Sequence, residues 1–151
     1  MRTVQFTVLL FLLVSASFLH AQSSGSGTLE IRFTGIRNDK GQMAIGINNA
    51  PEGWPREPQM NANWKKANIN NGVFVARVEN LPFGTYAISV LDDENSNLEM
   101  DMALGIPREG WGFSMNPPFK FSTPKFSECY FLLDQPIQQI TINLRYAGKG
   151  K

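Results

Sequence analysis

Apolar and polar residues alternate along several short stretches of the chain, which is the pattern of β-strands with one buried face. Leu29, Ile31 and Phe33 form the first such stretch, and a second one spans residues 43–47. A turn at residues 38–41 separates them, so together they predict a β-hairpin. No stretch shows the spacing of an amphipathic helix over three turns, and the best short helical candidate lies near residues 100–104.

Later stretches repeat the strand pattern, at residues 64–69, 73–78, 126–133 and 140–146. The first two flank Asn70-Asn71-Gly72, which is a strong hairpin signal. Tyr86, Ile88 and Val90 follow a Leu-Pro-Phe-Gly-Thr-Tyr corner, and we expect them to face the core. About seven strands at this spacing predict an all-β fold, an immunoglobulin-like or transthyretin-like antiparallel β-sandwich. A small closed barrel is the alternative.

One long stretch, from residue 91 to about residue 125, follows neither pattern. It contains four prolines, Pro107, Pro117, Pro118 and Pro124. A loop of this length in a compact β-domain is usually functional or disordered. We therefore expect loop 91–125 to form the ligand or partner face of the molecule.

The N-terminal residues have the order of a secretory signal peptide. Arg2 gives a positive start, an apolar run extends to Leu19, and Ala21 precedes polar residues. This order predicts cleavage after Ala21 and export to the periplasm or the medium. An uncleaved anchor is the alternative, but the apolar run is shorter than the roughly 20 residues of a membrane span. The expected organisation is a signal peptide (1–21), a flexible leader (22–28), a β-sandwich domain (29–146) and a frayed tail (147–151), with no membrane span after cleavage.

Charge and side-chain chemistry exclude several function classes. Loss of Arg2 leaves 13 basic residues against 13 acidic ones, so the mature domain has no electrostatic case for binding nucleic acid. The single histidine, His20, lies in the signal peptide, which excludes histidine-dependent catalytic triads and ordinary zinc sites. Cys129 lies in an apolar stretch, and we expect it to be a buried, unreactive thiol.

Oxygen-bearing side chains occupy alternate positions at the start of the long loop, at Asp93, Asn95, Asn97, Glu99 and Asp101. Tight calcium loops supply side-chain and backbone oxygens with this spacing, so these five residues are candidate calcium ligands, Glu99 through its carbonyl. Leu98 stands where such loops have a glycine, and Leu104 stands where they have a closing glutamate. The missing carboxylate would come from Asp92, Glu94 or Glu109, and we expect weak binding.

Three aromatic side chains among glycines and prolines, Trp54, Trp111 and Phe113, are candidate contacts for a protein or carbohydrate partner. The alternative is that they fold back and cover an open end of the sandwich. Two other functions remain open. One is a carboxylate-based hydrolase that uses Asp92, Asp93, Glu94 or Asp101. The other is a structural protein of envelope assembly.

The segment Gly105-Ile106-Pro107-Arg108-Glu109-Gly110-Trp111-Gly112-Phe113-Ser114 resembles the Gly-Ile-Pro-x-Glu-Gly-[Tyr/Trp]-Gly-Phe-Ser segment of a bacterial exported family, the domain of unknown function 2141. Residues 34–42, 81–88 and 93–97 are similar to its first hairpin, its Leu-Pro-Pro-Gly-x-Tyr-Ala corner and its Asp-Glu-Asn-Gly-Asn turn. Asp92 stands where the family usually has histidine, and Ser96 and Leu98 replace glycines of the turn. The resemblance implies a periplasmic or secreted β-sandwich and brings no activity with it.

These features together predict an exported, non-catalytic binding or accessory module. Loop 91–125 is its expected binding face. The acidic residues at its start are either a calcium site that structures the loop or, as the alternative, a solvated acidic turn without a metal.

Overall fold

The computed structural model describes residues 25–67, 69–118, 120 and 122–148. The expected signal peptide lies outside these residues. The elements in chain order are β1 (Ser26–Thr34), β2 (Gln42–Asn48), β3 (Met60–Lys65), β4 (Phe74–Pro82), β5 (Gly84–Asp93), β6 (Met102–Ala103), β7 (Ile106–Pro107), β8 (Gly110–Phe113), a 3₁₀ turn η1 (Phe126–Glu128), β9 (Phe131–Leu133) and β10 (Ile137–Asn143). Within the described part of the chain, no helix is long and apolar enough to cross a membrane.

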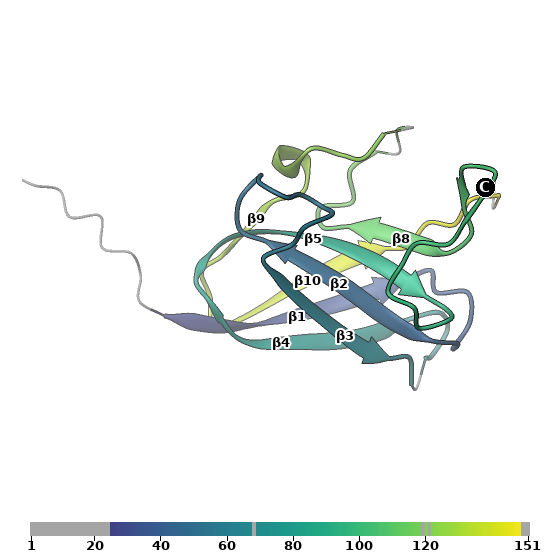
Figure 1. Ribbon diagram of the computed structural model, residues 1–151. Helices are drawn as coiled ribbons and strands as arrows, with labels where there is room; N and C mark the ends of the chain where they lie inside the picture. Colours follow the sequence, from purple (N-terminus) through teal and green to yellow (C-terminus); the bar gives the residue numbers. More distant parts are fainter. Residues whose placement is uncertain (1–24, 68, 119, 121, 149–151) are drawn as a thin grey trace, which may run out of the picture.

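The strands form two main sheets that face each other (Figure 1). One sheet has the order β10-β1-β4. The other has the order β3-β2-β5-β8, with β9 paired to the start of β5. The short β6–β7 hairpin stands apart from both sheets. The all-β sandwich expected from the sequence is confirmed.

One pair of strands departs from a purely antiparallel arrangement, because β10 runs parallel to β1. Parallel neighbours need a long connection. The connection from β1 to β10 spans residues 35–136 and contains all the strands of the other sheet. The last strand thus closes the sandwich against the first.

The core consists of the alternating apolar residues that the sequence pattern picks out. Leu29, Ile31 and Phe33 of β1 are fully buried, and the apolar residues of β2 and β5 pack opposite them. These are Met43, Ile45, Ile47, Tyr86, Ile88 and Val90. Period-two alternation therefore identifies the inner faces correctly.

Two strands begin earlier than the sequence indicates. β1 starts at Ser26, so residues 26–28, which we assigned to the flexible leader, belong to the sheet. Gly27 is closely packed there, since a Cβ at this position would lie 2.4 Å from the carbonyl oxygen of Gln135. β3 spans Met60–Lys65 rather than residues 64–69, because its pairing with β2 runs from Met60, two residues after Pro58, to Lys65.

The long loop contains more regular structure than expected. The helical candidate at residues 100–104 is wrong, because β6 and β7 form a hairpin there. Leu104 and Gly105 both have positive φ, as a two-residue hairpin turn requires. The segment Gly110–Phe113 is strand β8 rather than loop. Residues 126–128 form the turn η1, so only residues 131–133 of the expected last-but-one strand are extended.

Candidate functional site

The acidic turn at the start of the long loop is built around the carboxylate of Asp93. This side chain is fully buried, although it is charged. Its Oδ1 accepts the backbone N–H of Asn97 at 3.0 Å, and its Oδ2 accepts the backbone N–H of Leu98 at 3.0 Å. Oδ2 also accepts a 2.6 Å hydrogen bond from Nε2 of Gln42. Asp93 therefore fixes the turn to strand β2.

Three other candidate ligands, which lie in the same turn as Asp93, form hydrogen bonds with one another. The side-chain amides of Asn95 and Asn97 donate to the two oxygens of Asp101, at 2.9 and 3.3 Å. Oδ1 of Asn95 accepts the N–H of Asn97 at 3.1 Å, and Oδ1 of Asn97 accepts the N–H of Glu99 at 2.8 Å. The structure thus brings together four of the five predicted side chains, while the side chain of Glu99 is exposed.

The three carboxylates considered as extra calcium ligands each bind other groups of the protein. Glu94 forms a two-pronged ion pair with Arg37, at 2.5 and 2.9 Å. Glu109 is buried and accepts the backbone N–H groups of Glu94 and Asp101, at 2.8 and 3.1 Å. Asp92 pairs with a lysine, as described below. Glu109 thus contacts the acidic turn through backbone N–H groups, whereas Asp92 and Glu94 are paired with basic side chains.

The donor set of the turn is of the type that calcium prefers, but it is small. Asp93 and Asp101 supply carboxylates, and Asn95 and Asn97 supply amide oxygens. A calcium ion takes about six to eight oxygens, so backbone carbonyls and water would have to complete the site. In the described part of the chain, no group of three or more histidine, cysteine, aspartate or glutamate side chains is arranged to hold a metal.

A buried charged network, not foreseen from the sequence, lies beneath the turn. Nζ of Lys66 is 2.5 Å from Oδ1 of Asp92, and both side chains are fully buried. The hydroxyl of Tyr146 donates to Oδ2 of the same carboxylate. Burial, reinforced by Asp92, raises the pKa of Tyr146 far above its ordinary value, so this hydroxyl stays protonated and acts as a donor.

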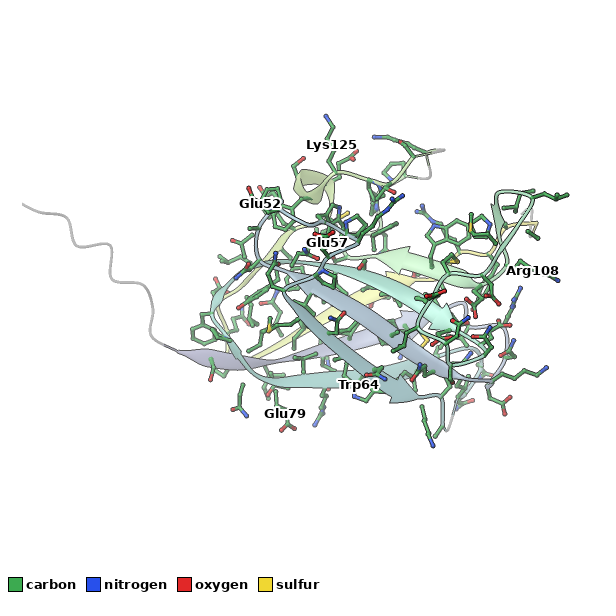
Figure 2. All side chains as sticks on the ribbon, in the orientation of Figure 1. Glu52, Glu57, Trp64, Glu79, Arg108 and Lys125 are labelled. Carbon is green, nitrogen blue, oxygen red and sulfur yellow. The ribbon has the colours of Figure 1, made fainter. Side chains whose placement is uncertain are left out.

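Arg37 connects this network to the loop. Its guanidinium lies 4.6 Å from the centre of the Tyr146 ring and donates to the carbonyl oxygen of Arg108 at 2.7 Å. The hydrogen bond to Glu94 raises the pKa of Arg37, and the same bond lowers the pKa of Glu94. The base of the long loop is therefore held by matched charges from both sheets. In Figure 2, Arg108 marks this end of the molecule, while Glu79 projects from β4 on the other sheet.

The candidate aromatic contacts are half-buried rather than fully exposed. The ring of Trp54 lies 5.8 Å from Phe113 and 6.0 Å from Phe126, measured between centroids. Its indole Nε1 donates to the carbonyl oxygen of Pro124 at 2.9 Å. Trp111 shares the face of Phe113 on β8, because the two residues are two positions apart. These aromatics partly cover the outer face of the β3-β2-β5-β8 sheet.

A groove of about 490 Å³ crosses the same outer face. Small residues, Ala44, Gly46 and Ser89, lie along it, with Pro55 and Pro58 from one loop and Leu98 and Met100 from the long loop. Among the described residues, no carboxylate lines this groove or the second groove, which lies next to Phe126 and Tyr130. The lining is mostly apolar and suits an apolar or weakly polar ligand.

The most unusual surface feature is a group of exposed apolar side chains in the long loop. Ten large hydrophobic residues of the described chain are exposed, and five of them lie in loop 91–125. They are Leu98, Met102, Leu104, Ile106 and Met115. Leu104, at the apex of the β6–β7 hairpin, is fully exposed. An uncharged run at residues 102–107 accompanies this feature in the sequence, and it overlaps the short helix expected near residues 100–104.

A family model described as "Uncharacterized protein conserved in bacteria (DUF2141)" matches residues 31–141. The chain belongs to this family. The resemblance drawn from Gly105–Ser114 is thereby confirmed, and in this DUF2141 domain that segment runs from the turn of the β6–β7 hairpin to the end of β8. No curated protein and no solved structure matches the chain.

Proposed function

We propose that this DUF2141 protein is an exported, non-catalytic binding or accessory module, and that loop 91–125 is its partner face. The observation that carries the proposal is the exposure of Leu98, Met102, Leu104, Ile106 and Met115 within this one loop. Several large apolar side chains exposed on one segment favour an interaction site over an ordinary solvated loop. Ion pairs and hydrogen bonds also fix the base of the loop to the sandwich, which favours a preformed binding face over a mobile one.

The arrangement of carboxylates favours a binding module over a hydrolase. A carboxylate-based hydrolase needs two carboxyl groups facing one cleft, roughly 5 to 10 Å apart. Asp92 and Asp93 are fully buried, and each is committed to hydrogen bonds with protein groups. Glu94 is paired with Arg37, and neither described groove has an acidic lining residue.

A structural role for calcium is the second part of the proposal. Asp93, Asn95, Asn97 and Asp101 would supply side-chain oxygens, and Glu99 would supply its backbone carbonyl. The ion would replace the amide-to-carboxylate hydrogen bonds that now hold Asp101. Its effect would be to stiffen the turn directly before the exposed hairpin, at the weak affinity of extracellular calcium modules.

Export is the third part of the proposal, with cleavage after Ala21 and a periplasmic or secreted product. It is supported by the order of charged, apolar and small residues at the N-terminus. The intact mass of the protein recovered from the periplasm and the medium tests this part directly. A recovered chain that retains residues 1–21 would contradict it.

Site-specific cross-linking in living cells tests the partner face. A diazirine amino acid replaces Leu104 at the hairpin apex or, as the control, Glu79 on the opposite sheet. Both positions are exposed and neither side chain makes a hydrogen bond or ion pair in the described structure. Diazirines react with protein and sugar alike, so we expect a discrete adduct from position 104 and none from position 79. Equal labelling from the two positions, or no adduct from either, would refute the assignment of the face.

A further inference from the structure

The β6–β7 hairpin exposes apolar side chains, and the groove on the outer face of the β3-β2-β5-β8 sheet is lined mostly by small or apolar residues. We propose that the hairpin of one copy docks into this groove on a second copy of the chain. The inference rests on the proposed function, since it takes the same loop as the interaction face. It adds the identity of one partner, which is the protein itself.

The β6–β7 hairpin is the protruding surface in the proposed contact. Met102, Leu104 and Ile106 are all more than half exposed, and no charged residue lies between Asp101 and Arg108. Only two residue pairs hold β6 to β7, and the hairpin pairs with no other strand. Its apex is therefore free to enter a concave surface without breaking any sheet.

The groove is the surface that receives the hairpin in the proposed contact. Its volume of about 490 Å³ lies within the range of roughly 300–1,000 Å³ that is typical of ligand sites. Its lining is largely small or apolar, and it includes Ala44, Gly46, Pro55, Pro58, Ala62 and Phe113. A few aliphatic side chains can fill such a space without leaving a buried charge unpaired.

The charges beside the two surfaces are also complementary. Arg56 lines the groove, is exposed, and makes none of the four ion pairs found among the described residues. Glu99 stands three residues before β6, is exposed, and likewise makes none of those ion pairs. A docking register that places Glu99 of one copy next to Arg56 of the other would form an ion pair between the copies, which favours this register over others.

The positions of the two surfaces favour a closed dimer rather than a fibre. Leu98 and Met100 line the groove and lie just before β6, so hairpin and groove are neighbours on one molecule. Neighbouring complementary surfaces can be exchanged reciprocally about a two-fold axis, which satisfies both at once. The expected product is a symmetric dimer in which each hairpin occupies the groove of the other copy.

Sedimentation velocity of the mature chain, from micromolar to millimolar concentration, tests the proposal. We expect a monomer–dimer equilibrium that Leu104→Asp weakens roughly 10- to 100-fold, because the apolar burial of this side chain is lost. Ile137→Asp is the matched control, since Ile137 is 66% exposed but lies on β10 in the other sheet. Arg56→Glu should also weaken the dimer, and Arg56→Glu with Glu99→Arg should restore it.

A cysteine pair tests the geometry independently. Copies carrying Leu104→Cys are mixed with copies carrying Asn61→Cys under mild oxidation, because Asn61 is exposed and lines the groove opposite Gly46. We expect a mixed disulfide between the two kinds of copy. Copies carrying Ile137→Cys in place of Leu104→Cys should give none. A monomer at all concentrations, or a dimer that survives Leu104→Asp, would overturn the proposal. A dimer sensitive to Leu104→Asp but not to Arg56→Glu, with no mixed disulfide, would overturn the docking of hairpin into groove.

The failure of this inference and that of the proposed function are distinguishable. A strictly monomeric protein whose position 104 still cross-links to another molecule in cells would refute self-docking and retain the partner face. A dimer with no other adduct would support self-docking and make the second copy the partner of this face.

Discussion

Lys66 and Asp92 form an ion pair in which both side chains are fully buried and the Nζ–Oδ1 distance is 2.5 Å. Lys66 follows β3 and Asp92 lies near the end of β5, so the pair links two strands of the same sheet that are separated by β2. Tyr146 binds the second oxygen of Asp92 from the C-terminal segment. Three distant parts of the chain therefore meet at one carboxylate directly below the acidic turn.

Removal of one partner of this ion pair should destabilise the fold. We expect Lys66→Ala to lower the free energy of unfolding by about 3–5 kcal/mol, because it leaves a buried carboxylate without its cation. The double change Lys66→Met with Asp92→Leu should recover most of that loss, since it removes both desolvated charges. Urea unfolding followed by tryptophan fluorescence measures both effects.

The exposed pair of Arg77 and Glu30 is the control for this prediction. Their closest atoms are 2.8 Å apart, but the side chain of Arg77 is 65% exposed. Arg77→Ala should change the free energy of unfolding by less than about 1 kcal/mol. A similar loss for Arg77→Ala and Lys66→Ala would contradict the importance of the buried pair.

A second prediction concerns Asp93. Asp93→Asn replaces one acceptor oxygen with a donor, which would face the N–H of Asn97 or Leu98. We expect a loss of about 1–3 kcal/mol in the free energy of unfolding, the cost of leaving a buried polar group unsatisfied. Amide exchange at Asn97 and Leu98 should become faster.

Asp101→Asn is the matched control for Asp93, because Asp101 is only half-buried and accepts its side-chain bonds from two exposed asparagines. It should cost clearly less than Asp93→Asn. An equal cost would mean that the turn depends on its surface hydrogen bonds rather than on the buried carboxylate.

The strands that form the core could be predicted from the sequence because burial imposes a period of two on them. Leu29 to Phe33, Met43 to Ile47 and Tyr86 to Val90 all show this period and all lie inside. Turns form at Gly41 and Gly72, where both glycines take positive φ. The hairpins predicted there are wrong, because β1 and β2 lie in different sheets, and so do β3 and β4. Local sequence therefore predicts the strands and turns here, whereas the pairing of the strands depends on the tertiary fold.

Strand β8 and the β6–β7 hairpin could not be predicted in this way. The pattern Gly-Trp-Gly-Phe has no apolar alternation, because glycines 110 and 112 face close neighbours. A Cβ at these positions would lie 2.5 Å from the Tyr146 ring and 2.7 Å from the Ile142 side chain. The hairpin is exposed, so burial leaves no periodic signature on it.

The buried network was missed for a different reason. Lys66 and Tyr146 are distant in sequence, and neither stands next to a recognisable motif. A lysine after a strand usually points to solvent. Only the fold shows that Lys66 turns inward to Asp92, which we had considered as a calcium ligand or catalytic acid.

The calcium proposal makes a third prediction. Added calcium at about ten times its Kd should raise the free energy of unfolding by about 1.4 kcal/mol, measured against an EDTA-treated sample. Asp101→Asn should abolish this gain, whereas Glu99→Gln should not, since Glu99 is expected to bind through its backbone carbonyl. Magnesium is the ionic control. An unchanged melting temperature in millimolar calcium would exclude a site of useful affinity.

A fourth prediction concerns pH and the Arg37–Glu94 pair. The hydrogen bond from Arg37 lowers the pKa of Glu94 below its ordinary value of 4.5. Since the folded-state pKa is the lower one, the pair contributes its full stability above about pH 4.5 and loses it as the pH falls through the folded-state pKa. The stability difference between the wild type and Glu94→Gln should therefore be largest near neutral pH and shrink toward zero in acid.

Urea midpoints of the two proteins, measured at a series of pH values from neutral to strongly acidic, give this difference directly. Arg37→Gln should show the same pH dependence as Glu94→Gln, because each change removes the same interaction. Glu99→Gln is the control, since its exposed carboxylate makes no ion pair in the described part of the chain. A difference for Glu94→Gln that stays constant down to strongly acidic pH would show that the pair does not stabilise the fold through its charge.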